Sequence, residues 1–110
     1  MSILKKLALA AGLATALSSA AMAADGMTVG FSQIGSESGW RAAETSVTKS
    51  QAESRGINLK FADAQQKQEN QIKAIRGFIA QGVDAILVAP VVATGWEDVL
   101  NEAKEANIPV

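Results

Sequence analysis

The stretch between Gly82 and Pro90 constrains the fold of this chain more than any other part of the sequence. It reads Val-Asp-Ala-Ile-Leu-Val-Ala, which is almost continuously apolar and is bounded by two residues that interrupt regular structure. A short apolar run of this kind is typical of a parallel strand that is covered on both faces. The sequence therefore predicts a buried central strand over residues 83–89, with helices on both sides of its sheet.

Segments with strand and helix patterns alternate around this predicted strand. Residues 27–32 and 57–61 alternate apolar with small or polar residues, as strands do, and the polar residues of the second segment indicate a sheet edge. Helical composition follows over 38–55 and 67–81 and again from Thr94, and the last three residues begin a fourth strand. This alternation predicts the α/β class, a doubly wound parallel sheet with strand order 2-1-3-4.

Glycines and short polar patterns mark the predicted helix ends. Gly56 and Gly82 follow the first two helices and are expected to end them, with Gly56 in the left-handed conformation. Thr94 and Glu97 form a Thr-x-x-Glu capping box for the third helix, and the Asp-x-x-Gln pattern that begins at Asp63 is another helix-start pattern.

The first 23 residues have the three-part layout of a secretory signal peptide. Lys5 and Lys6 precede an apolar stretch over 7–17, and Ala21-Met22-Ala23 has the small-x-small pattern of a signal-peptidase site. The apolar run is about half of the ~20 residues that a membrane-spanning helix needs, which disfavours an anchor. We expect residues 1–23 to direct export, to a bacterial periplasm, and the remaining segment 24–110 not to insert into the membrane.

Composition narrows the class of function. The chain has 10 basic and 11 acidic residues, and without Lys5 and Lys6 the exported part has 8 and 11. A mildly acidic domain lacks the basic surface that binds nucleic acid. The sequence contains neither cysteine nor histidine, which disfavours transition-metal sites, thiol or histidine catalysis, and disulfides. Its carboxylates show no pairing suited to acid–base catalysis, so we expect no enzyme, no cofactor and no metal.

Candidate binding residues lie where the predicted strands end. Ligands in an open parallel sheet sit beyond the carboxyl ends of the strands, which selects the loops over 33–41, 63–66 and 90–95. The first loop is the richest, and its candidate ligand-binding residues are Glu37, Ser38, Gly39, Trp40 and Arg41. An aromatic ring packs against the apolar face of a sugar, while guanidinium and carboxylate groups hydrogen-bond its hydroxyls. The glycine spacing matches neither dinucleotide-binding nor P-loop patterns, which disfavours a nucleotide site.

These side chains have other roles that the residues alone leave open. Trp40 could pack in the core at the start of the first helix. Glu37 and Arg41 could be solvated charges, with Glu37 favouring the helix N-terminus through the helix dipole. Trp96 belongs to an apolar stripe of the third helix, which favours core packing.

The chain resembles the periplasmic sugar-binding proteins of ABC transporters, of the ribose and galactose type, and among these the galactofuranose-binding members. The resemblance is carried by Val29-Gly30-Phe31-Ser32-Gln33 and by the run ESGWRAAE over 37–44. It continues through ADAQQKQENQIKAIRGFIAQGVDAILVAPVVATGW over 62–96 and on to Val110. It implies a two-lobed receptor that closes on galactofuranose or a related monosaccharide and presents it to a membrane permease.

The resemblance also implies roles for individual residues. Trp40 would stack on the sugar ring, Arg41 and Glu37 would hydrogen-bond its hydroxyls, and Ser38 and Gly39 would contact it from the same loop. An Asp-Arg pair, the second lobe and the returning hinge would follow Val110, so we expect 24–110 to be part of the N-terminal lobe of a longer, monomeric protein.

Two alternatives accompany this expectation. The same scaffold could bind another small ligand, such as a pentose, a hexopyranose or a signalling furanose, and report to a chemoreceptor or sensor kinase. A sugar-responsive repressor shares the lobe architecture, but its DNA-binding segment would have to stand where the signal peptide stands.

Overall fold

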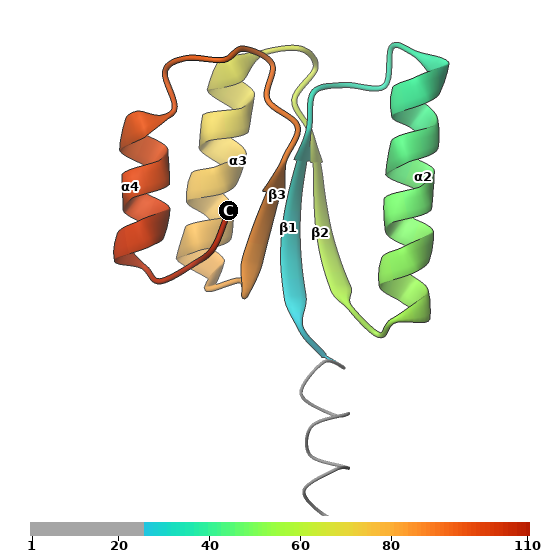
Figure 1. Ribbon diagram of the computed structural model, residues 1–110, viewed down its shortest axis with the longest axis horizontal. Coiled ribbons are helices and arrows are strands. Elements are labelled where there is room, and N and C mark those ends of the chain that lie inside the picture. The colour runs from blue at the N-terminus through green and yellow to red at the C-terminus, as the bar shows by residue number, and fades with distance from the viewer. Residues whose placement is uncertain (1–25) are drawn as a thin grey trace, which may run out of the picture.

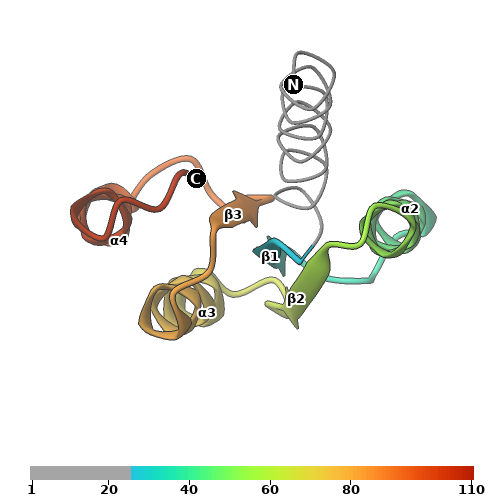
Figure 2. The ribbon, with the colours of Figure 1, turned by 90° about the horizontal axis from the view of Figure 1, so that it is seen from below.

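The computed structural model describes residues 26–110, so the predicted signal peptide over 1–23 lies outside the described residues. Three strands and three helices alternate along this part of the chain. They are β1 (Thr28–Gln33), α2 (Gly39–Ser54), β2 (Asn58–Asp63), α3 (Gln68–Gln81), β3 (Ala85–Val88) and α4 (Glu97–Glu105). The strands form one parallel sheet, with α2 on one face and α3 and α4 on the other (Figures 1 and 2). The predicted α/β class and parallel sheet are confirmed.

The strand order is β2-β1-β3, which places β2 at an edge as its polar residues predicted. In the register, Phe31 of β1 aligns with Phe61 of β2 and with Leu87 of β3. Beyond β3, the backbone N–H of Ile86 donates to the carbonyl of Pro109 at 2.9 Å. The last residues therefore begin to pair beside β3, in agreement with the predicted order 2-1-3-4.

The main core lies between the sheet and the α3–α4 layer. Ile75 of α3, Ile86 of β3 and Val99 of α4 are at most 1% exposed. The core cluster consists of Ile75, Phe78, Val83, Ile86, Val99 and Ile108. Burying one such large apolar side chain contributes about 1.5–3 kcal/mol, so this cluster is what holds α3 and α4 against the strands.

The opposite face of the sheet is covered less completely, and this corrects the prediction that β3 is buried on both sides. Leu87 is 48% exposed, whereas its neighbour Ile86, which points toward α3, is 1% exposed. α2 packs over β2, and β3 lies farther from it (Figure 2). An apolar groove of about 350 Å³ remains between α2 and the sheet, lined among others by Val29, Val47, Ala52, Leu59, Ala85 and Leu87.

The helices end as the glycines predicted. Gly56 after α2 and Gly82 after α3 have φ angles of 69° and 68°. At both positions the left-handed residue and the residue after it donate their N–H groups to carbonyls of the last helical turn, which is the Schellman arrangement. Asn107 ends α4 in the same way, with a φ of 59°. No helix among residues 26–110 is long and apolar enough to cross a membrane.

The predicted capping box at Thr94 is wrong. α4 begins at Glu97 after Trp96, and no side-chain hydrogen bond caps it. The carbonyl of Thr94 instead accepts a hydrogen bond of 2.6 Å from the side chain of Gln68 on α3. Gly95 then takes a φ of 86°, which interrupts the chain between the predicted cap and the helix.

The predicted helix start at Asp63 is wrong as well. Asp63 is the last residue of β2, and its carboxylate accepts a hydrogen bond of 2.8 Å from the N–H of Gln65. Gln65 and Gln66 have φ angles of 51° and 63°, which a helix cannot continue. α3 therefore begins only at Gln68.

Candidate functional site

The carboxyl ends of the three strands meet at one end of the sheet, where three loops leave for the helices (Figure 1). These are the β1–α2 loop over 34–38, the β2–α3 loop over 64–67 and the β3–α4 loop over 89–96. They correspond to the three loops expected to carry binding residues, because ligands of open parallel sheets lie beyond the carboxyl ends of the strands.

Main-chain hydrogen bonds join these loops. The N–H of Gln66 in the second loop donates to the carbonyl of Ile34 in the first, at 2.7 Å. The N–H of Ala89 in the third donates to the carbonyl of Ser32 at the end of β1, at 3.0 Å. These bonds hold the second loop against the first and the start of the third loop against the end of β1.

The five predicted ligand-binding residues stand together at the start of α2. Glu37 and Ser38 end the β1–α2 loop, and Gly39, Trp40 and Arg41 form the first turn of the helix. Ser38 is the N-cap, because its hydroxyl accepts a hydrogen bond of 3.2 Å from the N–H of Arg41. This cap fixes where the helix begins and therefore where the next two side chains project.

Trp40 is exposed, and its alternative placement in the core is wrong. Its fractional exposure is 74%, although it sits only two residues after the N-cap of a helix that packs on the sheet. Several large apolar side chains of residues 26–110 are exposed, and Trp40 is the most exposed of them. The ring offers a flat apolar face beside charged neighbours. Trp96, by contrast, packs against the core cluster as predicted, and its indole N–H donates to the carbonyl of Val92 at 2.7 Å.

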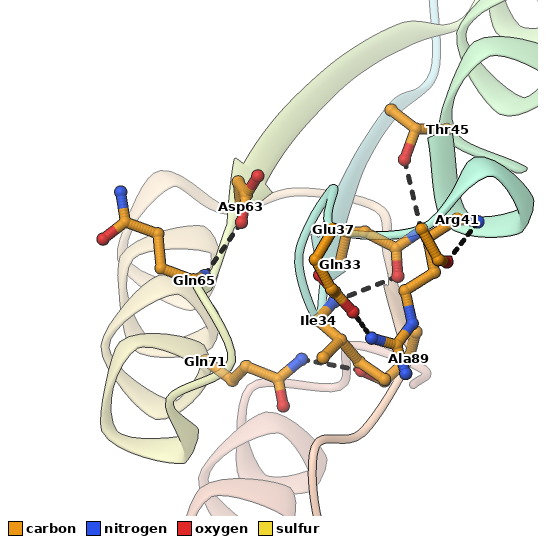
Figure 3. A network of polar contacts seen from close by, with 10 residues as sticks. Gln33, Ile34, Glu37, Arg41, Thr45, Asp63, Gln65, Gln71 and Ala89 are labelled. Atoms are coloured by element: carbon orange, nitrogen blue, oxygen red, sulfur yellow. Dashed lines mark hydrogen bonds and ion pairs between the residues drawn. The ribbon is translucent and has the colours of Figure 1, made fainter. Parts of the chain in front are cut away.

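Glu37 and Arg41 form an ion pair across one helical turn (Figure 3). Their side chains are 33% and 31% exposed, so they are neither buried nor freely solvated. A pair of this exposure adds little to stability. The pair places the guanidinium beside the carboxylate, and Arg41 keeps further N–H donors that this pair does not use.

Sequence reasoning missed the buried amide of Gln33, the last residue of β1. Its side-chain oxygen accepts from the N–H of Ile34 at 3.0 Å, and its side-chain nitrogen donates to the hydroxyl of Thr45 on α2 at 3.2 Å (Figure 3). The side chain is wholly buried. Gln33 therefore ties the end of the strand to the helix that carries Trp40. Nothing in the local sequence distinguishes it from an exposed loop residue.

Sequence reasoning also missed Gln71 of α3, which is 0% exposed. Its side chain bonds the backbone of the β3–α4 loop at Ala89 and Val91. A signal for its burial was present, because Gln71 precedes Ile75 by four residues and Phe78 by seven, which places it on the apolar face of the helix.

No cluster of three acidic, histidine or cysteine side chains that could hold a metal ion occurs among residues 26–110. The absence of a metal or cofactor stays a prediction. Arg76 and Glu102 join α3 to α4 on the surface. The hydrogen bond between them raises the pKa of Arg76 and lowers the pKa of Glu102.

An open parallel sheet whose strand-end loops lead to an exposed indole and a guanidinium–carboxylate pair is the architecture typical of ligand-binding α/β proteins. Residues 29–110 match the family described as periplasmic binding protein domain, and the chain belongs to this family. The resemblance that the sequence motifs indicated is thereby confirmed.

Curated relatives are similar over most of this chain. The galactofuranose-binding protein YtfQ of Escherichia coli strain K12 is 70% identical over 106 residues, which are 96% of this chain and 33% of YtfQ. The fructose import binding protein FruE of Bifidobacterium longum strain NCC 2705 is 38% identical over 84 residues, which are 76% of this chain and 26% of FruE. The chain thus spans a third or less of the length of these two relatives.

Solved structures show the same fold. A galactofuranose binding protein is 78% identical with a TM-score of 0.76. The periplasmic binding protein of an arabinose ABC transporter from Shewanella sp. ANA-3, bound to α- and β-L-arabinofuranose, is 71% identical with a TM-score of 0.76. A Mycobacterium smegmatis protein in complex with β-D-fucofuranose is 62% identical with a TM-score of 0.75. Each match covers 76% of this chain and 28% of the other, so residues 26–110 form part of the N-terminal portion of a periplasmic binding protein fold.

Proposed function

We propose that this chain supplies part of the N-terminal lobe of an exported receptor that binds galactofuranose or a related furanose sugar and delivers it to an ABC importer. The exposed Trp40, beside the Glu37–Arg41 pair at the ligand end of the sheet, carries this proposal. The names of the similar proteins support it, because three of the solved structures are described with galactofuranose, arabinofuranose or fucofuranose.

Each side chain at the start of α2 has a role in this function. The indole of Trp40 stacks on the apolar face of the sugar ring, which removes both surfaces from water. Arg41 donates hydrogen bonds to ring hydroxyls and Glu37 accepts them. Because the two charges are already paired, less side-chain freedom is lost when the sugar binds, and this preorganisation favours affinity.

The ligand site needs a second wall. An indole at 74% exposure on an open surface covers only one side of a ligand. We propose that residues 24–110 belong to the first of two lobes and that the second lobe closes over the sugar, which stabilises the closed form. The receptor acts by binding and closure, as a monomer, and performs no covalent chemistry.

Residues 1–23 are proposed to direct this protein to the periplasm. The basic start, the apolar stretch and the Ala21-Met22-Ala23 pattern support cleavage after Ala23. N-terminal sequencing of protein recovered from the periplasm is expected to begin at Ala24, and a chain that keeps Met1 would contradict cleavage.

Calorimetric titration of the full-length protein with galactofuranose and other monosaccharides tests the binding function. Trp40→Ala is expected to weaken binding of the preferred furanose about tenfold or more, because the stacked surface is lost. Val47→Ala is the matched control, since Val47 is another exposed apolar residue of α2, at 59%, farther along the helix. Equal affinity of wild type and Trp40→Ala would refute the stacking role.

A receptor for a different small ligand that reports to a chemoreceptor or sensor kinase is the second candidate. The similarity to a fructose import binding protein supports a different sugar rather than a different mode of action. Deleting the gene should abolish uptake of the preferred sugar if the receptor serves an importer. Unchanged uptake with a lost chemotactic response would favour signalling.

A further inference from the structure

We infer that Gln71 and Gln68 of α3 are positioning residues that fix the β3–α4 loop as a preformed wall of the sugar site. This inference rests on the proposed function, because it assigns the two amides a part in ligand affinity. Neither residue belongs to the β1–α2 loop or to α2, the helix that carries Trp40 and Arg41.

Gln71 bridges the loop on either side of Pro90. Its side-chain nitrogen donates to the carbonyl of Ala89 at 2.7 Å, and its side-chain oxygen accepts from the N–H of Val91 at 2.9 Å (Figure 3 shows the first of these bonds). One amide thus satisfies a backbone acceptor and a backbone donor two residues apart, as a neighbouring strand would. The side chain is 0% exposed, so water does not compete for these bonds.

Gln68 holds the far end of the same loop. It lies three residues before Gln71, on the same side of the helix, and its side-chain nitrogen donates to the carbonyl of Thr94 at 2.6 Å. Hydrogen bonds from Gln71 therefore hold the loop near its start, and the hydrogen bond from Gln68 holds it near its end at Thr94. The segment between these points has no regular secondary structure.

This loop stands beside the proposed site. The N–H of Ala89 donates to the carbonyl of Ser32, so the loop begins directly alongside the end of β1, from which the β1–α2 loop also departs. Proline has no N–H, so Pro90 cannot extend the pairing, and the loop depends on side chains for its shape. A wall that is ordered before the ligand arrives loses less entropy on binding.

The test compares variants of the full-length protein by calorimetric titration with galactofuranose and by amide hydrogen exchange. Gln71→Met keeps the length of the side chain and removes both bonds. We expect the affinity to fall about tenfold and the Val91 amide to lose its protection. Gln68→Met removes one bond, and a smaller loss of affinity is expected.

Two controls on the same helix separate positioning from loss of stability. Ile75→Val destabilises the core one turn farther along and makes no bond to the loop. Gln81→Met makes the same chemical change at an exposed residue at the end of α3. Both are expected to bind galactofuranose with wild-type affinity at a temperature where all variants are folded.

The outcomes are distinguishable. Unchanged affinity of Gln71→Met with a deprotected Val91 amide overturns the inference, as does an equal loss of affinity in Ile75→Val. A Val91 amide that stays protected in Gln71→Met overturns the tether itself. If wild type binds no furanose, the proposed function fails, while the exchange measurement still decides whether Gln71 holds the loop.

Discussion

The ring of Phe78 lies against the backbone of Gly30. A β-carbon built on Gly30 would lie 2.5 Å from two atoms of the Phe78 ring, closer than any real contact of a β-carbon. Gly30 belongs to the central strand and Phe78 to α3, so this close approach sets how near the helix comes to the sheet. Glycine is required here because it has no side chain, and its backbone flexibility plays no part.

Gly30→Ala is therefore expected to destabilise the fold by about 1–3 kcal/mol, because the methyl group must push α3 away or displace a buried ring. Urea unfolding measures the change. Gly77→Ala on α3 is the control, since a β-carbon there meets its nearest atom at 3.9 Å. It should stabilise the protein by about 0.5–1 kcal/mol, as glycine-to-alanine changes inside helices do. Equal effects of the two substitutions would contradict the close-packing explanation.

Ser32→Ala is expected to leave stability unchanged or to raise it slightly. Ser32 is wholly buried, and its hydroxyl oxygen has no hydrogen-bond partner within residues 26–110. A buried hydroxyl without a partner costs about 1–3 kcal/mol, so its removal relieves a penalty. The adjacent Gln33→Met breaks two satisfied bonds and should cost about that much. A marked loss of stability in Ser32→Ala, measured by thermal unfolding, would mean that the hydroxyl has a partner.

The Arg76–Glu102 pair makes stability depend on pH. Two hydrogen bonds of 3.0 Å join these side chains across α3 and α4, and the hydrogen bond from Arg76, followed by its charge, holds the pKa of Glu102 below its usual range near 4.5. A carboxyl with a lowered pKa stabilises the fold above that ordinary value and loses the contribution as pH falls through its folded-state pKa. When the pH is lowered from about 6 to about 3, the melting temperature should therefore fall slightly less for Glu102→Gln than for wild type.

Salt provides an independent check of the same pair. Both side chains are about half exposed, so the effect is small and should shrink further in about 1 M salt. Glu105→Gln is the control on α4, because no ion pair of Glu105 occurs among residues 26–110. If Glu102→Gln and wild type lose the same stability with acid, the pair contributes nothing to folding.

Gly35→Ala should separate ligand affinity from stability. A β-carbon at Gly35 would collide with the carboxylate of Glu37, which is the free end of a flexible side chain and can move away. Stability should then change by less than about 0.5 kcal/mol. Affinity for the sugar should fall several-fold, because Glu37 leaves its position beside Arg41. Gly77→Ala, on α3, should bind as wild type does, and a Gly35→Ala protein with full affinity would remove Glu37 from the site.

The strand–helix alternation could be predicted because it depends on local patterns. The apolar run before Pro90 indicated a strand, and the polar residues of 57–61 placed β2 at the edge, where it lies. Gly56 and Gly82 marked two helix ends because a left-handed residue is a local requirement. The position of Glu37 to Arg41 at the start of a helix also followed, because the Gly- and Ser-rich segment before it is a local pattern.

The wrong predictions concern residues whose interactions depend on parts of the chain that are distant in sequence. Thr94 was expected to cap α4, but its carbonyl is held by Gln68, 26 residues earlier, and the capping box does not form. Asp63 has a helix-start pattern as one interpretation, but it turns the chain through Gln65 toward the β1–α2 loop. Leu87 was expected to be covered, and it is exposed because α2 packs over β2 on that face.

The sequence by itself determined the elements and their order in the sheet, because hydrophobic periodicity and helix-ending residues act over a few neighbours. The family followed from the resemblance of the motifs over 29–33, 37–44 and 62–96. Only the tertiary structure decided the state of the side chains at the carboxyl ends of the strands. It put Trp40 in solvent, paired Arg41 with Glu37 and buried Gln71 against the β3–α4 loop. The environment of a side chain depends on its contacts with residues that are distant in sequence. These contacts form only when the helices pack on the sheet.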